Sequence, residues 1–360
     1  MSFAVIVVLI TVMQFTDKLS IHACMPIYAL SIINIGARRS VMEMIKEFKK
    51  IHIDKRGGEK GEEGVETMTQ NEVLQFPIVA GGMLVGLYFA IEYFGKEAVN
   101  KVILSYFALV GSQAMKGLIL SLGNQKAQEL DAKKLFHLKL KMLELDTEVS
   151  PMDFIGLAMS SVAMYFYVQT KNWIFNNIIA TMVSISGIQL MFLGNFKNGF
   201  MMLTGLFFYD IFFVFKTDVM LTVAKSIDAP IKLLFPNDWS ADPPKFSLLG
   251  LGDIVIPGIF MSMCLRWDVI RALKASSVNA LASEGDRDDA ILKKLYRSYQ
   301  TCPKSYYLGC VVGYLLAIIT TVVVMILFDH GQPALLYLVP ACLGSTTLIA
   351  LCNGEFKKLW

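Results

Sequence analysis

The sequence predicts an all-α polytopic membrane protein with about nine transmembrane helices. Hydrophobic residues make up 55% of the 360 residues and charged residues only 18%, whereas soluble proteins carry roughly 25% charged residues. The apolar residues are gathered into blocks long enough to cross a bilayer, which takes about 20 residues per helix. The expected spans are 20–36, 76–94, 99–121, 152–169, 173–193, 196–215, 247–267, 305–328 and 333–352.

The composition also argues against several classes of function. The formal net charge of +3 is close to neutral, which disfavours nucleic acid as a partner. The six cysteines are scattered without paired metal-ligand spacing. The chain contains neither a His-Glu-x-x-His zinc motif nor a Gly-x-Ser-x-Gly nucleophile elbow. We therefore expect neither a metal nor a cofactor.

The distribution of lysine and arginine predicts the orientation in the membrane. If the first span exits into the cytosol, the cytosolic segments hold 24 of these residues and the opposite side holds 8. Because basic residues are enriched on the cytosolic side of membrane proteins, the N-terminus is expected in the lumen and the C-terminus in the cytosol. Only an odd number of spans places the two ends on different sides.

The last residues of the chain contain a lysine pair, Lys357-Lys358. Lysines at the third and fourth positions from a cytosolic C-terminus fit a dilysine signal for retrieval to the endoplasmic reticulum, which a receptor reads. The alternative is a basic flank after the last span, as the positive-inside rule requires. The residues alone leave both interpretations open.

Asp210 is the first of two acids that lie where a bilayer makes charge costly. It sits inside the apolar run 206–215. An ionisable residue within a span is a functional hypothesis by default, and its side chain is expected to face a polar interior. The alternatives are a buried acid capped by a polar neighbour and a cation-coupling residue of a transporter. Tyr209 directly precedes Asp210 and is a candidate to place a hydroxyl near it.

Asp253 is the second acid, and it follows Gly250-Leu251-Gly252 in another apolar run. Two glycines inside a span weaken a helix and expose backbone groups. Unwound backbone at membrane depth is tolerated only where it lines a cavity, and such a cavity would let water reach the acid. The alternative is close helix packing through small residues.

The two acids become a catalytic hypothesis if their carboxyl groups meet. Like charges in contact cannot both ionise cheaply, so the pair would share one proton and titrate as a unit. The ionised member then takes a proton from water while the neutral member donates to a carbonyl oxygen. This is the chemistry of aspartic proteases, and it needs no metal.

Two other classes of function use the same acids. A secondary transporter or channel would use them for cation coupling, although the chain lacks the paired interrupted helices that inverted repeats give. Such a protein would show ion flux and no cleavage. A non-catalytic scaffold would go on binding its partners after both acids were removed.

The last expected span opens with Gln332-Pro333-Ala334-Leu335. Proline suits a first helical turn, because its missing amide hydrogen would have no partner there. A helix start is therefore the simple explanation of this segment. In the fifth expected span, Asn176 and Asn177 are most simply interhelical hydrogen-bonding groups.

Three motifs together resemble the intramembrane aspartyl proteases, which are the presenilins and the signal peptide peptidases. They are Tyr209-Asp210, Gly250-Leu251-Gly252-Asp253 and Pro333-Ala334-Leu335. The longer strings 250–260 and 223–232 resemble the signal peptide peptidase version, and the similarity runs from about residue 20 to residue 354. Presenilins fit less well, because they carry a long loop between the two catalytic helices and have the opposite orientation.

This resemblance implies roles for individual residues. Asp210 and Asp253 correspond to the catalytic dyad. Tyr209, Gly250, Leu251 and Gly252 would support the active site, and Gln332, Pro333, Ala334 and Leu335 would position the substrate. The implied substrates are transmembrane segments with a cytosolic N-terminus, chiefly signal peptides left in the endoplasmic reticulum membrane. The lipid bilayer is the other partner, and a homo-oligomer is left open.

The expected organisation follows from the spans and the resemblance. Residues 1–19 form a short lumenal N-terminus, whose apolar part is too short to cross. Residues 20–195 form an N-terminal bundle with cytosolic loops at 37–75 and 122–151. The start of the first loop, 41–48, has helical periodicity and is expected on the membrane surface. Residues 196–352 form the catalytic transmembrane region, and 353–360 form a cytosolic tail. A short helix on the lumenal membrane surface is expected at 217–228.

Overall fold

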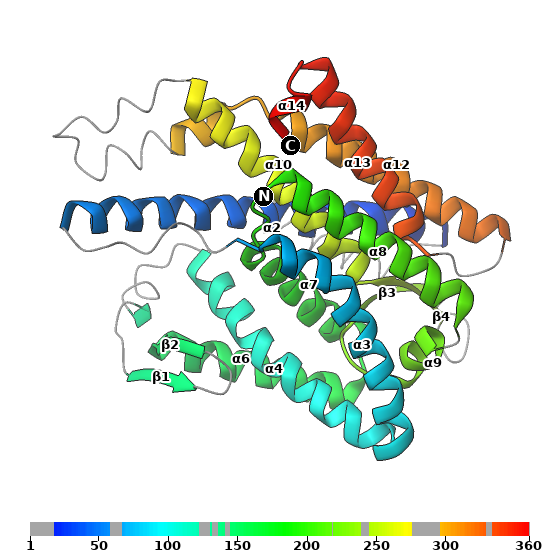
Figure 1. Cartoon of the computed structure of the whole chain (residues 1–360). Helices are drawn as coiled ribbons and strands as arrows, with labels where there is room; N and C mark the ends of the chain where they lie inside the picture. The colour runs from blue at the N-terminus through cyan, green and yellow to red at the C-terminus, as the bar shows by residue number, and fades with distance from the viewer. Residues whose placement is uncertain are drawn as a thin grey trace.

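The computed structural model is a bundle of long helices with two small β-hairpins (Figure 1). It describes residues 18–57, 67–121, 130–131, 136–140, 145–217, 219–238, 245–275, 296–328 and 333–359. The predictions for 1–17 and for 58–66 lie outside the described residues.

Each of the nine expected spans overlaps a long helix. These helices are α2 (Lys18–Gly57), α3 (Gln70–Phe94), α4 (Lys96–Ser121), α6 (Pro151–Thr170), α7 (Trp173–Leu190), α8 (Phe196–Lys216), α10 (Gly252–Ala275), α12 (Ser305–Phe328) and α13 (Leu335–Cys352). Within the described ranges, seven are long and apolar enough to cross a membrane, and α2 and α10 are not among these seven. A polytopic helical membrane protein is therefore confirmed, while the count of nine spans stays a prediction.

Residues 37–57, which belong to the first predicted cytosolic loop, continue α2 as one helix. The helix predicted at 41–48 is therefore confirmed, but it is part of a longer helix. Val41, Met44 and Ile45 recur at helical spacing and are buried in the core. Their burial against neighbouring helices offsets the polar residues between them, so the helix extends past the apolar run that marked the span.

The predicted start of the seventh span is also wrong. Residues 247–250 belong to strand β4 (Lys245–Gly250), which pairs with β3 (Lys232–Asp238) in an antiparallel hairpin. Helix α10 begins only at Gly252, so Asp253 lies in its first turn instead of its interior. Glycine disfavours helix, and the β3 partner provides the backbone hydrogen bonds that a helical turn would have supplied.

The remaining elements are short. Strands β1 (Phe136–Leu140) and β2 (Leu145–Val149) pair within the expected loop 122–151. Helix α9 (Val219–Ser226) confirms that the segment after α8 is helical, and its place on a membrane surface stays a prediction. Helix α14 (Phe356–Leu359) ends the described chain.

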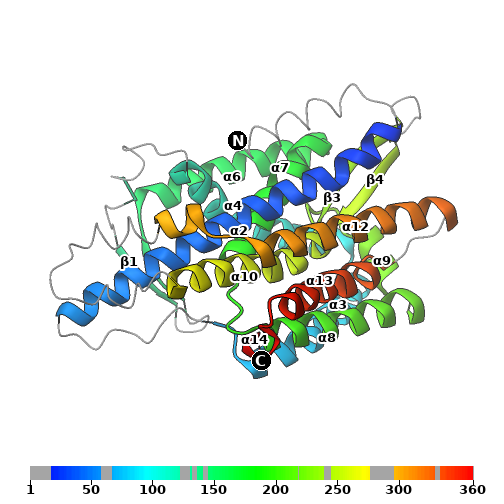
Figure 2. The ribbon, with the colours of Figure 1, turned by 90° about the horizontal axis from the view of Figure 1, so that it is seen from above.

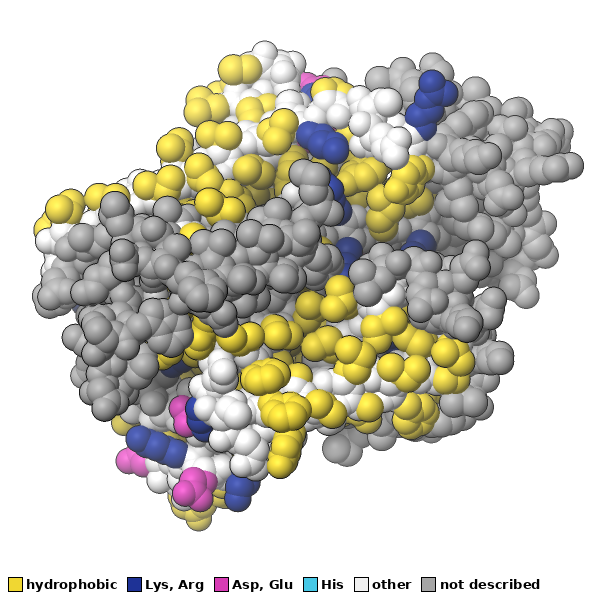
Figure 3. All heavy atoms as spheres, turned by 180° about the vertical axis from the view of Figure 1, so that it is seen from behind, with side chains coloured by type: hydrophobic (Ala, Val, Ile, Leu, Met, Phe, Trp, Pro, Cys, Tyr) yellow, Lys and Arg dark blue, Asp and Glu magenta, His cyan; other side chains and the backbone are white. Residues whose placement is uncertain are grey.

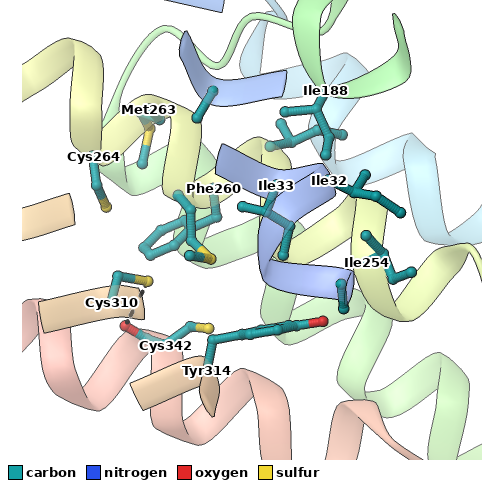
Figure 4. Packing of buried hydrophobic residues seen from close by; sticks show 14 of the residues in the cluster. Ile32, Ile33, Ile188, Ile254, Phe260, Met263, Cys264, Cys310, Tyr314 and Cys342 are labelled. Carbon is teal, nitrogen blue, oxygen red and sulfur yellow. Dashed lines mark hydrogen bonds between the residues drawn. The ribbon is translucent and has the colours of Figure 1, made fainter. Parts of the chain in front are cut away.

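Helix α2 is central to the core, where it packs against α7, α10 and α12 (Figure 2). Ile188 of α7 packs against a glycine of α2 and a glycine of α10. A Cβ added at Gly36 of α2 or at Gly258 of α10 would lie 2.8 or 2.6 Å from Ile188 atoms. Figure 4 shows this isoleucine beside Ile33 of α2. The glycines therefore allow α2, α7 and α10 to pack closely as the support of the site.

Much of the described surface is apolar. Figure 3 shows hydrophobic side chains spread over the described part of one face. The side chains of Ile78, Met83 and Val102 are 67–74% exposed. Soluble monomers rarely expose contiguous apolar surface of this extent, and lipid tails would cover it in a membrane.

Candidate active site

Asp210 is buried where three helices meet. It lies on α8, is only 5% exposed, and α8 packs against both α3 and α13. The approach of α3 is close, because a Cβ added at Gly205 would lie 2.6 Å from Pro77. The backbone N–H of Leu335 donates to Asp210 Oδ2 at 3.2 Å. This N–H belongs to the first residue of α13 and has no acceptor within its own helix.

Asp253 lies on α10 and faces the same place. It is half-buried, and its carboxyl group interacts electrostatically with that of Asp210. A Cβ added at Gly250 would lie 3.3 Å from Asp253 Oδ2, so the carboxyl group lies against the end of β4. The hydroxyl of Tyr314 on α12 donates to the carbonyl oxygen of Asp253 at 3.2 Å, and Figure 4 shows this hydroxyl reaching toward neighbouring Ile254.

The segment at the start of α13 reaches the acids through its backbone. Leu335 and Pro333 are buried and Ala334 is half-buried. The first turn of α13 is closed by Leu336 N–H donating to Pro333 O at 3.2 Å. The positive end of the helix dipole therefore lies beside Asp210. Gln332 lies outside the described residues.

The other predicted support residues have different surroundings. The ring of Tyr209 packs against Phe213, with ring centroids 4.7 Å apart, and lies near Gly81 of α3. Leu251 N–H donates to Ile231 O at 3.2 Å, which extends the hairpin ladder toward α10. Gly252 is exposed, and a Cβ there would meet only Ile256, at 3.8 Å. The roles of these three residues stay predictions.

The hairpin presents the β3 edge to α7, and its other edge, that of β4, ends at Gly250 beside the Asp253 carboxyl group. Leu234 faces Leu248, and Lys232 faces Gly250. Residues of an antiparallel pair alternate between bonding each other and turning their backbone groups outward. Leu234 and Lys232 both bond outward to asparagines of α7. Their partners Leu248 and Gly250 therefore turn their N–H and C=O groups toward the outer edge of β4, where Leu248 is 53% exposed.

The sequence did not identify Tyr314 or the hairpin as parts of the site. Tyr314 lies in an apolar run that gives no sign of a polar contact. The hairpin did leave a signal, because Asn237-Asp238 and Pro243-Pro244 lie between two short apolar runs. Turn residues between such runs are typical of paired strands.

Two features of the described residues bear on other kinds of site. No group of three or more His, Cys, Asp or Glu residues among them has the arrangement of a metal site. A cavity of about 870 Å³ between α2, α4 and α7 is lined by Arg39, Lys116 and Gln189 among others, and neither Asp210 nor Asp253 lines it.

Comparison with known proteins supports the resemblance that these motifs indicated. The family model described as signal peptide peptidase matches residues 60–360. The chain belongs to the signal peptide peptidase family. The match contains both acids and the segment that opens α13.

Relatives from several organisms have the same kind of name. The chain is similar to "Signal peptide peptidase" of Mus musculus, with 35% identity over 84% of this chain and 75% of the relative. It is similar to "Signal peptide peptidase" of Homo sapiens, with 34% identity over 84% of this chain and 76% of that relative. "Intramembrane protease 2" of Caenorhabditis elegans is 43% identical over 58% of this chain and 42% of its own length. These names support a protease that acts within the membrane.

Proposed function

We propose that this protein is an intramembrane aspartyl protease that hydrolyses peptide bonds of membrane-embedded helices with Asp210 and Asp253. The observation that carries the proposal is that the carboxyl groups of α8 and α10 lie close enough to interact electrostatically, while the N-terminus of α13 donates to one of them. A lone acid at this depth would fit many roles. Two interacting acids with one aligned backbone donor fit the activation of water.

The surroundings of the two carboxyl groups assign them different tasks. The Leu335 N–H and the positive end of α13 stabilise an ionised Asp210. The shared proton then resides on Asp253. Asp210 accepts a proton from water as the water oxygen attacks the peptide carbonyl carbon. Asp253 donates its proton to the carbonyl oxygen, which gives a neutral diol. When the C–N bond breaks, a proton passes from Asp210 to the leaving nitrogen and one diol proton returns to Asp253.

A helical substrate must unwind before this reaction, because its scissile carbonyl is hydrogen-bonded within the helix. The outward N–H and C=O groups of Leu248 and Gly250 offer the unwound segment a strand to pair with. Gly250 also lies against the Asp253 carboxyl group. An extended substrate on the outer edge of β4 would therefore present its backbone beside the dyad.

Replacing Leu248 with proline tests this edge. Proline is tolerated on a strand edge where the N–H points away from the partner strand, so Leu248→Pro keeps the hairpin and removes one donor. We expect a loss of about three- to tenfold in kcat/KM, the effect of one hydrogen bond. Cleavage of a signal-peptide reporter by purified protein in lipid measures it. Leu248→Ala keeps the N–H and controls for the lost side chain. Equal kcat/KM for both variants would contradict substrate pairing at β4.

The proposed substrates are signal peptides and other segments with a cytosolic N-terminus in the endoplasmic reticulum membrane. The relatives' names, the lysine and arginine distribution and the lysine pair at the C-terminus support this proposal. With the C-terminus in the cytosol, Lys357 is exposed beyond the last long helix, where a cytosolic receptor would meet it.

Retrieval by the lysine pair gives a direct prediction. We expect an N-terminally tagged chain with Lys357→Ala and Lys358→Ala to leave the endoplasmic reticulum, because the receptor loses both contacts. Fluorescence microscopy measures the distribution. The matched control replaces another adjacent pair, Lys293 and Lys294, and should keep the wild-type distribution. Unchanged localisation of the C-terminal variant would leave the lysines as a basic flank only.

A further inference from the structure

Two buried asparagines on α7 bond the backbone of β3 along its outer edge. Asn177 Nδ2 donates to Leu234 O at 2.8 Å, and Leu234 N–H donates to Asn177 Oδ1 at 2.8 Å. Asn176 Nδ2 donates to Lys232 O at 2.7 Å and to Asn177 Oδ1 at 3.1 Å. The two asparagines are 1% and 0% exposed. The sequence predicted hydrogen-bonding roles for both residues but placed their partners on another helix.

The Asn177 side chain takes the place of a neighbouring strand. A carboxamide carries one carbonyl acceptor and N–H donors, as a peptide group does. It therefore completes both hydrogen bonds that Leu234 would make to a third strand. Both asparagines are buried, so a backbone group of Leu234 left without its partner there would be costly. The hairpin is thus held at one position along α7, because a shift by one residue would turn these backbone groups away from Asn177.

Because β4 is paired with β3, anchoring the hairpin on α7 also fixes where the outer edge of β4 lies. Leu234 fixes Leu248 through the strand pairing, and Gly250 follows two residues later against the Asp253 carboxyl group. Helix α7 is itself held against α2 and α10 by Ile188. A rigid connection therefore runs from α7 through the asparagines and both strands to the edge next to the acids.

We infer that Asn177, assisted by Asn176, is a positioning residue that sets which substrate bond lies at the dyad. This inference rests on the proposed function and on substrate pairing at β4. It adds that the register of cleavage is set on α7, a helix that contributes neither acid. Loss of the asparagine contacts lets the hairpin move along α7, and the bond that reaches Asp210 and Asp253 then varies.

The test compares Asn177→Ala and the milder Asn176→Ala with a matched control, Asn198→Ala. Asn198 is also buried and donates to a backbone carbonyl, that of Met68, at 2.9 Å. Each purified protein in lipid cleaves the same signal-peptide reporter, and mass spectrometry identifies the product ends. Hydrogen exchange of peptides from 232–250 reports hairpin anchoring without any need for cleavage.

We expect Asn177→Ala to cut at two or more adjacent bonds where the wild type has one main site, with kcat/KM lowered about fivefold. Asn176→Ala should show a weaker form of the same change. Exchange in 232–250 should accelerate in both, whereas Asn198→Ala should keep the wild-type exchange and cleavage site even if its melting temperature falls. Unchanged cleavage sites in Asn177→Ala would overturn the inference. Failure of the wild type to cleave any reporter would instead overturn the proposed function, and unchanged exchange would then show that the asparagines do not anchor the hairpin.

Discussion

Asp210→Asn and Asp253→Asn are each expected to reduce cleavage of a signal-peptide reporter to less than about one thousandth of the wild-type rate. The expected size follows from general acid–base catalysis, which contributes up to about 10⁴-fold, and from the dependence of each carboxyl group on the other. An amide at Asp210 cannot take a proton from water, and an amide at Asp253 has no carboxylic proton to donate. Single-turnover cleavage by purified protein in lipid measures both effects.

A buried acid outside the site provides the control for these variants. Asp268 is fully buried and accepts hydrogen bonds from the backbone N–H groups of Tyr306 and Tyr307 at 3.4 and 3.0 Å. Asp268→Asn keeps an acceptor for the start of α12, so we expect a lower melting temperature and retained cleavage. Substantial cleavage by Asp210→Asn or Asp253→Asn, with the fold preserved, would remove the dyad from the mechanism.

Gly250→Ala is expected to lower kcat by about ten- to a hundredfold. The added methyl group would lie 3.3 Å from Asp253 Oδ2, which is closer than an ordinary contact, so the carboxyl group has to shift. Small misplacements of a catalytic group are costly, since about 1 Å can cost 10²-fold in rate. Measurement of kcat and KM separately shows the effect, because the shift affects the chemical step and leaves most substrate contacts intact.

Gly252→Ala is the matched control for this change. The methyl group there meets only Ile256, at 3.8 Å, and Gly252 does not have a positive φ. We therefore expect kcat within about twofold of the wild type, as for most surface substitutions. Equal losses at both glycines would show that the motif serves backbone flexibility, as the sequence suggested, and not the placement of the Asp253 carboxyl group.

Some elements were predictable from the sequence because one physical effect dominates them. Helix α12 covers the expected range 305–328, since an uninterrupted apolar run of that length has no competing structure in a membrane. Asp210 stood out for the related reason that a charge in such a run is costly. The meeting of Asp210 with the start of α13 followed only from the family resemblance, because no local pattern encodes a contact between residues 125 positions apart.

Other elements depend on tertiary contacts that the pattern of residues does not show. The apolar run before Asp253 fits a helix or a strand equally well, and pairing with β3 decides between them. The C-terminal part of α2 was expected on a membrane surface or in a loop, yet its buried stripe at Val41, Met44 and Ile45 lies in the core. Asn177 was expected to bond to another helix, but its partner is the strand β3.

The most direct test of the account is reconstitution of the purified wild type, Asp210→Asn and Asp253→Asn in lipid vesicles that contain a signal-peptide reporter. Mass spectrometry identifies any new peptide ends, and ion flux is recorded in the same vesicles. We predict new ends inside the apolar segment of the reporter with the wild type alone, and no ion flux that depends on the two acids. An uncut reporter together with acid-dependent ion flux would contradict the account and favour a transporter, and equal cleavage by all three proteins would contradict the dyad.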